Sequence, residues 1–553
     1  MLVEDFSENE LNVNIKEIVA SPEKFLQNSF EYYIENIKTE EEKNVEIGSD
    51  TVRNFNPLYK NCFKFNSEVE GEKIKKDEKL NSFLQSQEIP FLDEVIENIN
   101  NTNSHNISNE PSSSTTNKQN KQKPMISLVK LFFSISNINE NNIYLSILPK
   151  KENSNTKNLC LKFKEINEED INNHEFNQEN LEKDYLLERL SLEINPISTS
   201  IRKENKCPNS PNMEFIFYDY ENNSAKYNTL LRSISIAYIE TTTKNEGESG
   251  NENENSCIVV RLHSLYSEEI TLNELYFKKD FSGNAVRKLF SNQSKEKIKE
   301  EFTTLKLSFH QALKGLFTNY STNNNEEEDS YLNLISEYLI LNLISSVFSR
   351  QGMNLIGYLP LNLSNLESNS KVKLNLLGLL NKVFPVVNYF NCTIESLESS
   401  NIIPTFNVDT EVLSKSILQC PKGGLIIIDE TELKTGKLKE NGIKNFNYIK
   451  KMIEQQVINL EYPYNPGIEI FVNNPILILS HSKSIFLQNS DVLVNIKVGK
   501  ESNEKKELTG ILNKESKKIE NKDLESCIEY IRLGRILTTH PDFTENFIIS
   551  EEI

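Results

Sequence analysis

A short apolar run that ends in two acids, Leu425 to Glu430 (LIIIDE), constrains this chain more than any other feature. Four consecutive apolar residues predict a buried strand of an α/β sheet. An apolar strand ending in Asp-Glu is also the Walker B pattern of P-loop ATPases, in which the acids hold Mg²⁺ and orient a water molecule. By spacing alone, the simpler interpretation of Asp429 and Glu430 is a strand that ends in two solvated acids.

The phosphate-binding half of an ATPase site is absent from the sequence. A P-loop requires the pattern GxxxxGK[ST], and none precedes the acidic pair. The strand expected to lead into such a loop is Leu355 to Leu363, which Pro360 interrupts. The residues that follow it, Ser364 to Ser370, contain no glycine and no lysine. We therefore expect no ATP binding through a P-loop, and no cofactor.

Composition limits the classes of function. The 553 residues are 37% hydrophobic, with 29 Phe and 20 Tyr, which is enough for several domains with cores. The net charge of −20 argues against direct binding of duplex DNA, because phosphate neutralisation needs a basic face. Seven cysteines without a CxxC pair indicate a reduced intracellular chain without a metal site. The N-terminus lacks the apolar segment of a signal peptide, and no apolar run reaches membrane-spanning length, so we expect no membrane contact.

Periodicity and low-complexity tracts predict an α+β multidomain chain. Residues 1–98 show helical spacing of apolar residues and form a helical N-terminal region. Residues 99–124 are rich in Asn and Ser and are predicted to be a disordered linker. Residues 125–285 are predicted to form strands joined by Asn-rich inserts. Residues 300–553 are predicted to alternate helices and strands, as in an α/β domain. The polar tracts are expected to be loops, because they bury too little surface to offset chain entropy.

The segment 125–285 is expected to form a small OB-like β-barrel, with a β-sandwich as the alternative. The expected strands are 127–135, 143–148, 213–220, 256–263 and 270–277. Four aromatic residues in these strands could stack single-stranded bases, although strand aromatics more often belong to a core. They are Phe132, Phe133, Tyr144 and Phe217.

The segment 300–553 is expected to contain helices at 336–348, 371–384, 412–418, 446–456 and 524–537, and strands at 386–394, 425–429 and 475–480. Residues 457–462 and 468–472 are expected to form a hairpin over the turn Pro463 to Gly467.

The order of motifs in this segment resembles the ATPase core of the MCM replicative helicases. LIIIDE is followed by MIEQQVINL, a turn with Gly467, PILILS and LESCIEYIRL. Three features depart from that family. The Walker A loop is absent, the hairpin tip lacks a lysine, and the sensor strand ends in Ser480-His481 where the family has asparagine.

A closer resemblance is to the mini-chromosome maintenance complex-binding protein family. The chain is similar to it in SEYLILNLISSVFSR, LPLNLS, LIIIDETELKTGKL, IPFLDEV and SLVKLFF. The resemblance implies a degenerate, MCM-like AAA+ domain in which Asp429 and Glu430 are a vestigial Walker B.

The function that the resemblance implies is that of a non-enzymatic, nuclear regulator of DNA replication. Such a protein would bind MCM helicase subunits, promote their ATP-independent unloading from chromatin in late S phase and contribute to sister-chromatid cohesion. Two alternatives stay open, namely an active AAA+ ATPase and a single-stranded DNA-binding OB-fold protein.

Overall fold

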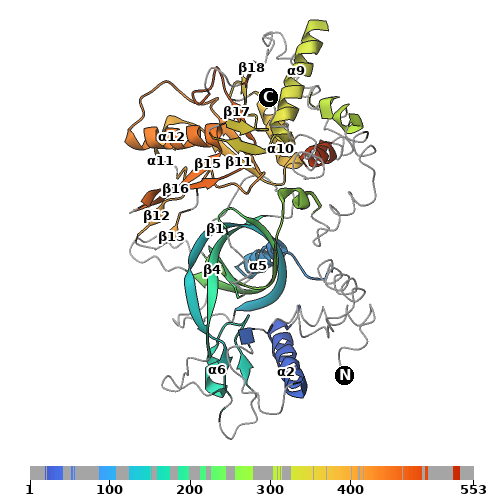
Figure 1. Ribbon diagram of the computed structural model, residues 1–553, viewed down its shortest axis with the longest axis vertical. Coiled ribbons are helices and arrows are strands. Elements are labelled where there is room, and N and C mark those ends of the chain that lie inside the picture. The colour runs from blue at the N-terminus through green and yellow to red at the C-terminus, as the bar shows by residue number, and fades with distance from the viewer. Residues whose placement is uncertain are drawn as a thin grey trace. The chain divides into compact units, whose positions relative to one another are not determined.

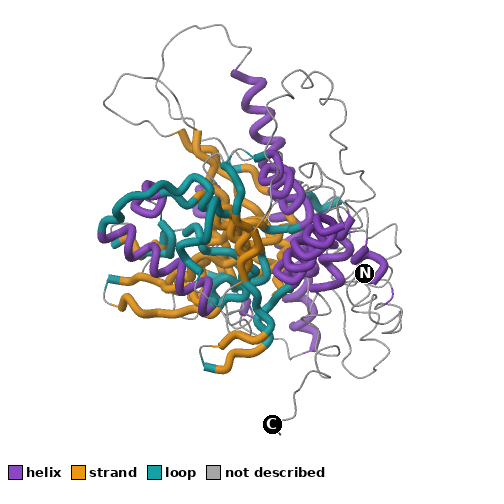
Figure 2. Tube along the Cα trace, turned by 90° about the horizontal axis from the view of Figure 1, so that it is seen from above, coloured by secondary structure: helices purple, strands orange, loops and turns teal. Residues whose placement is uncertain are grey.

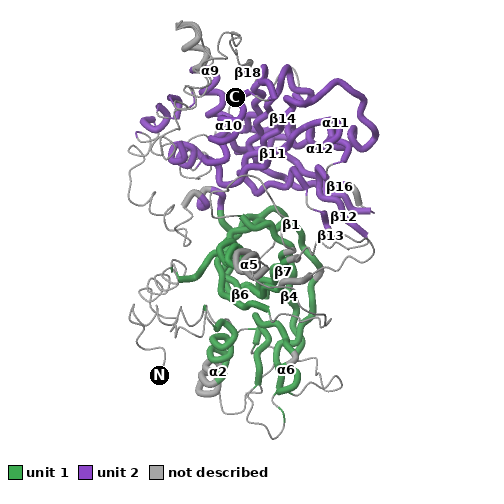
Figure 3. Tube along the Cα trace, turned by 180° about the vertical axis from the view of Figure 1, so that it is seen from behind, with its two compact units in different colours: residues 1–270, 279–282 green, residues 271–278, 283–553 purple. Residues whose placement is uncertain are grey.

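The computed structural model forms two compact units, which Figure 3 colours separately: residues 1–270 with 279–282, and residues 271–278 with 283–553. Apart from a few positions within them, the described ranges are 21–40, 86–107, 124–149, 158–174, 185–197, 212–218, 226–243, 256–277, 303–313, 326–352, 354–487, 492–495 and 527–535, together with the isolated positions 19, 52, 53, 55, 151 and 300.

The first unit is built on a closed five-stranded barrel (Figure 1). The strands follow one another around the barrel in the order β1-β4-β5-β7-β6. All neighbours are antiparallel except β5 and β7, which pair in parallel. The strands are β1 (Met125–Leu145), β4 (Leu186–Ile197), β5 (Asn212–Phe217), β6 (Leu230–Thr243) and β7 (Ser256–Glu269). The prediction of a small barrel is confirmed, and the alternative of a β-sandwich is wrong.

Alternating side chains of the strands fill the barrel. In β1, Val129, Leu131, Phe133 and Ile135 are spaced two residues apart and all belong to one buried cluster, because successive side chains of a strand point to opposite faces. Helix α5 (Leu92–Ile107) adds Leu92 and Val95 to the same cluster. The barrel therefore has a packed core.

The four aromatic residues considered for base stacking are buried. Phe132, Phe133, Tyr144 and Phe217 are only 3, 0, 8 and 4% exposed. The interpretation of these residues as core is confirmed.

The remaining elements of the first unit correct some predicted boundaries. Helix α5 extends to Ile107, so its last turns lie in residues 99–124, which were predicted to be a linker. The polar tract 166–182, which was expected to be a loop, includes helix α6 (Glu168–Asn173), which a capping box at Asn167 stabilises. Residues 272–277, predicted as a strand, form the 3-10 helix η4 (Leu272–Phe277).

Much of the helical region predicted for residues 1–98 lies outside the described residues. Within it the structure shows α2 (Pro22–Glu40), two helical residues at 52–53 and the start of α5. The short strands β2 (Ile147–Leu148) and β3 (Leu159–Cys160) pair beside the barrel.

The second unit is built on a five-stranded parallel sheet with the strand order β11-β14-β17-β10-β18. The strands are β10 (Leu361–Ser364), β11 (Val387–Asn391), β14 (Leu425–Asp429), β17 (Ile476–Leu479) and β18 (Val492–Asn495). The main helices around it are α9 (Glu326–Ile344), α10 (Lys371–Val383), α11 (Ile394–Ser399), α12 (Glu440–Gln455) and the helical residues 527–535. In Figure 2 the strands, in orange, lie between helices, in purple.

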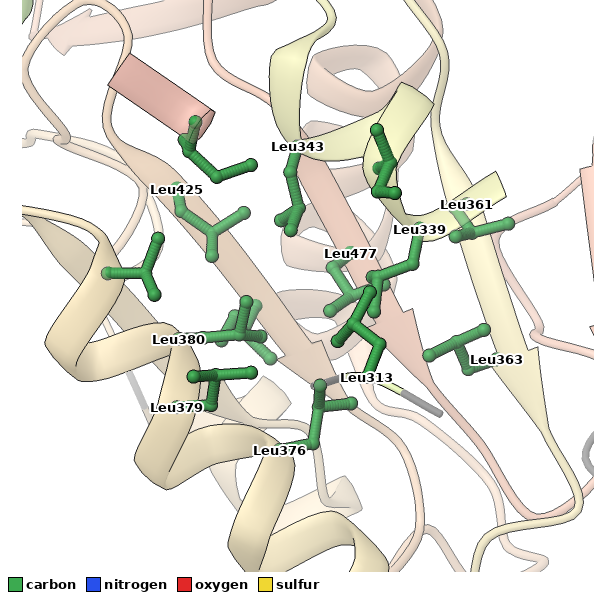
Figure 4. Close-up of a cluster of buried hydrophobic side chains, with 14 of the residues drawn as sticks. Leu313, Leu339, Leu343, Leu361, Leu363, Leu376, Leu379, Leu380, Leu425 and Leu477 are labelled. Atoms are coloured by element: carbon green, nitrogen blue, oxygen red, sulfur yellow. The ribbon is translucent and has the colours of Figure 1, made fainter. Parts of the chain in front are cut away.

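The apolar run Leu425 to Ile428 joins two separate cores. Leu425 and Ile427 of β14 pack in a cluster with α9, α10 and residues 527–535, while Ile426 and Ile428 pack in a second cluster with α11 and α12. Figure 4 shows the first cluster, with leucines of α9, α10, β10, β14 and β17. A strand buried on both faces needs an apolar residue at every position, which explains the unbroken LIII sequence.

The described residues of the second unit also include three two-stranded hairpins. They are β8 (Ser349–Gln351) with β9 (Asn354–Ile356), β12 (Phe406–Asn407) with β13 (Val412–Leu413), and β15 (Val457–Tyr462) with β16 (Asn465–Phe471). The β15–β16 pair confirms the predicted hairpin.

Two local predictions in this unit were wrong. The single strand expected over 355–363 is split between β9 and β10 around Pro360, which cannot donate a ladder hydrogen bond. The helix expected at 412–418 is replaced by β13 and a turn, because Val412 and Leu413 pair with β12.

Candidate functional site

The candidate site lies where β14 ends. Asp429 is the last residue of β14 and follows Leu425 and Ile427 on the strand face that α10 covers. Its side chain is buried, with an exposed fraction of 0%. The sequence-predicted acid therefore lies inside the protein, and the interpretation as a solvated acid is wrong for this residue.

Four hydrogen bonds saturate the Asp429 carboxylate. Oδ1 accepts the Thr431 backbone N–H at 2.9 Å and the Thr431 hydroxyl at 2.7 Å. Oδ2 accepts the Lys373 ammonium at 2.9 Å and the Tyr389 hydroxyl at 2.5 Å. Burial alone would raise the pKa of Asp429, but the hydrogen bonds from Tyr389, Thr431 and Lys373 outweigh it and hold the pKa below its ordinary value. Since a carboxylate has about four acceptor positions, none remains for a metal ion.

Lys373 supplies the positive charge of this cluster from the first turn of α10. Its backbone N–H bonds to the side chain of Ser370, the N-cap of the helix, at 3.2 Å. Lys373 is buried, with an exposed fraction of 4%. Its ammonium donates to the Asp429 carboxylate and to the Thr431 hydroxyl, each at 2.9 Å. A buried ammonium thus lies against the acid that would hold Mg²⁺ in a P-loop ATPase.

The loop between β10 and α10 does not form a phosphate cradle. In a P-loop the backbone N–H groups of this segment point at the phosphates. Here Asn365 N–H donates to the His481 carbonyl at 3.2 Å and Leu366 N–H to the Ser480 carbonyl at 3.0 Å. Ser370 N–H donates to the Glu367 carbonyl at 3.1 Å. These donors are committed to the protein itself.

Glu430 is buried on the other side of β14, which also contradicts a solvated acid. Its carboxylate accepts the Ser484 hydroxyl, and the Ile485 backbone N–H at 3.1 Å. Burial raises the pKa of Glu430 to about 7, although these two hydrogen bonds oppose the shift. Glu430 therefore fastens the loop after β17 to the end of β14.

Two other residues of the resembling motifs have structural contacts. Gln456 ends α12 in the left-handed conformation with φ 51°, and its side-chain oxygen accepts the Asn474 backbone N–H at 2.7 Å. Ser480, at the end of the sensor-like strand, donates to the Asn362 side chain at 2.8 Å. Both residues tie neighbouring elements of the second unit together.

The residues present do not fit a bound Mg²⁺–nucleotide complex. Asp429 already accepts four hydrogen bonds, three N–H groups of the loop donate to protein carbonyls, and the Lys373 ammonium lies against the acid that would hold the metal ion. Across the described ranges, no group of three or more His, Cys, Asp or Glu residues is arranged to hold a metal ion. No described helix is long and apolar enough to cross a membrane.

Sequence reasoning found Asp429 and Glu430 but missed Lys373, Tyr389 and Thr431. One local signal was available: a Thr two residues after a strand-ending Asp favours a side-chain turn of the kind seen between Asp429 and Thr431. Lys373 and Tyr389 are 56 and 40 residues away from Asp429 in the sequence. No spacing within a single motif points to them.

The fold and the site define a protein of two units, one with a closed barrel and one with a parallel sheet between helices. In the second unit, the acid at the end of strand β14 is paired with a buried lysine of the same chain. The chain belongs to the family described as Mini-chromosome maintenance replisome factor, whose model matches residues 26–549. This membership confirms the resemblance drawn from the sequence.

Curated relatives are similar to part of the chain, and each is named Mini-chromosome maintenance complex-binding protein. The relative from Dictyostelium discoideum is 32% identical over 164 residues, covering 29% of this chain and 23% of the relative. The relative from Drosophila melanogaster is 31% identical over 153 residues, covering 28% and 25%. The relative from Homo sapiens is 30% identical over 152 residues, covering 28% and 24%. The alignments thus span about a quarter of the length of these relatives.

Proposed function

We propose that this protein binds subunits of the MCM helicase complex and acts on that complex without catalysis. Family membership and the names of the relatives support the choice of partner. The buried Lys373–Asp429 pair supports the second part of the proposal, that the protein acts without catalysis.

The second unit is, in this proposal, a degenerate AAA+ domain related to the MCM core. Three features support this relationship. The strand-loop-helix β10–α10 belongs to the same parallel sheet as β14, the strand that ends in Asp-Glu. A hairpin, β15–β16, follows the helix after that strand. The next strand, β17, lies between β10 and β14.

The alternative of an active ATPase is disfavoured by the site. Phosphoryl transfer needs a metal ion and a phosphate cradle in the same place. Asp429 accepts four protein hydrogen bonds instead, and the loop donates to Ser480 and His481.

The alternative of a single-stranded DNA-binding OB protein is disfavoured by the barrel. Base stacking needs exposed aromatic faces, and the four candidate aromatics are at most 8% exposed. The closed barrel remains consistent with an OB-like domain that serves another purpose.

The proposed action is ATP-independent unloading of MCM from chromatin in late S phase, in the nucleus, with a contribution to sister-chromatid cohesion. A domain shaped like an MCM subunit can compete for an interface between two subunits of the ring. Binding free energy would then replace hydrolysis as the driving force for opening.

The test combines capture with disassembly. Purified MCM complex is incubated with the full chain in the absence of nucleotide, with ATP, and with a non-hydrolysable analogue. We expect capture of MCM subunits and the same loss of intact complex, measured by size-exclusion chromatography, in all three conditions. Disassembly that requires hydrolysable ATP, or the absence of any capture, would contradict the proposal.

A further inference from the structure

We propose that the loop of residues 431–439 is a preformed cationic docking surface for an acidic segment of a partner protein. This inference rests on the proposed function, because it assigns the acidic segment to an MCM subunit. The loop, TELKTGKLK, directly follows Asp429 and Glu430 and precedes α12.

The loop is held in place although it has no regular secondary structure. Leu433 N–H donates to the Glu430 carbonyl at 3.0 Å, and Lys439 N–H donates to the Glu398 carboxylate at 3.2 Å. Gly436 lies so close to α11 that an added Cβ would be 2.3 Å from Cδ1 of Ile394. A surface that is already ordered loses little conformational entropy on binding.

The side chain of Leu438 gives the loop an anchor in the interior. It packs against the buried cluster that contains the α11 and α12 side chains. The residues between the anchor points, 434 to 437, are all exposed. The interior contacts therefore fix the loop while its outer side chains face solvent.

The charge of the loop is opposite to that of the chain. It carries three lysines and one glutamate, whereas the whole chain has a net charge of −20. The glutamate, Glu432, receives a hydrogen bond from the Asn391 amide at 3.0 Å. Lys434 and Lys437 are exposed, and Lys439 is 85% exposed beside Glu398. A local cationic surface on an acidic protein favours a short acidic segment, since a long polyanion such as DNA would be repelled by the rest of the chain.

The place of the loop in the fold is consistent with docking. It leaves the carboxyl edge of the sheet next to the site that has lost its phosphate cradle, and Tyr389, 45% exposed, lies beside Asp429 at that edge. In nucleotide-binding domains this edge is where a neighbouring protein can supply a residue in trans. Without nucleotide chemistry, the same edge is available for protein contact alone.

The test reverses the charge of the loop in the full chain. The variant Lys434→Glu with Lys437→Glu is compared with Lys382→Glu with Lys422→Glu, two exposed lysines elsewhere in the same unit. Both double variants change the net charge by the same amount. We expect the loop variant to bind purified MCM subunits at least about tenfold more weakly, with a reduced salt dependence, and the control to bind as the wild type does. Thermal unfolding of all three proteins checks that each is folded.

Each outcome separates the inference from the proposed function. If the wild type captures no MCM subunit, the proposed function fails. If the wild type and the loop variant bind equally, the docking surface is wrong while the proposed function stands. If the loop variant loses binding to an oligonucleotide but not to MCM subunits, the loop is a nucleic-acid site and the inference is overturned.

Discussion

The ammonium of Lys373 lies 2.9 Å from Oδ2 of Asp429, and both residues are buried. The pair joins the first turn of α10 to the end of β14. A buried charge that loses its partner is strongly destabilising, whereas an intact pair contributes little net free energy because of its desolvation cost. Removing either partner is therefore expected to cost more stability than the intact pair contributes.

Replacing Lys373 with Met should lower the free energy of unfolding by roughly 3 to 5 kcal/mol, because Asp429 would be left buried without its counter-charge. Urea unfolding measures the loss. The control Lys382→Met changes an exposed lysine on the same helix and should alter stability by less than about 0.5 kcal/mol. Adding Asp429→Asn to Lys373→Met should recover part of the loss, and a double variant that is simply the sum of the two singles would show that the pair is not coupled.

Replacing Tyr389 with Phe removes one of the four donors to Asp429 and leaves the ammonium in place. We expect a loss of about 1 kcal/mol, well below that of Lys373→Met, since one hydrogen bond to a charged group is removed and the ring stays half exposed. The same unfolding experiment compares the two variants. A Tyr389→Phe loss equal to that of Lys373→Met would contradict the assignment of Lys373 as the principal counter-charge.

Replacing Glu430 with Gln should stabilise the protein at high pH. The pKa of Glu430 is raised to about 7 from 4.5, so the folded state favours the protonated form. Stability is therefore lost as the pH rises from about 4.5 to about 7, and the penalty persists above that range. Glutamine stays neutral, and we expect the variant to gain about 1 to 3 kcal/mol over the wild type at pH 8 and much less at pH 5. Melting temperatures at both pH values test this, and a pH-independent difference would refute it.

Replacing Arg350 with Ala should destabilise the end of α12 and the β15–β16 hairpin. Its guanidinium donates to the carbonyls of Gln455, Gln456 and Val472 at 2.6, 3.1 and 2.8 Å and lies 4.6 Å from the Phe471 ring centre. We expect a loss of about 2 to 3 kcal/mol, because three hydrogen bonds from the guanidinium are removed.

Lysine at position 350 should restore little of this stability, since a single ammonium cannot reproduce the planar fork. Amide hydrogen exchange in β15 and β16 reports the local effect. Full rescue by lysine would show that charge alone matters at this position.

The fold was predictable where one short segment carried the whole signal. Leu425 to Asp429 is a strand because every residue is apolar up to the acid, and 371–383 is a helix because its apolar residues recur at helical spacing. The site was predictable only in its acids. Lys373 and Tyr389 come to Asp429 through the packing of α10 and β11 around β14, which requires the sheet order. The prediction of a helix at 412–418 was wrong for a related reason. Val412 and Leu413 form a strand because they pair with β12, and this pairing is not visible within the segment itself.

The two cores that meet at β14 determine where the protein chain can accept inserted residues. Insertions in the Asn-rich tracts between strands leave the sheet register intact, because loop closure costs little for each added residue. One residue inserted within Leu425–Asp429 would exchange the sides of every side chain that follows it. The Asp429 side chain would then point to the opposite face of the sheet from Lys373. We therefore expect proteins of this family to tolerate long insertions in their loops and none within this strand.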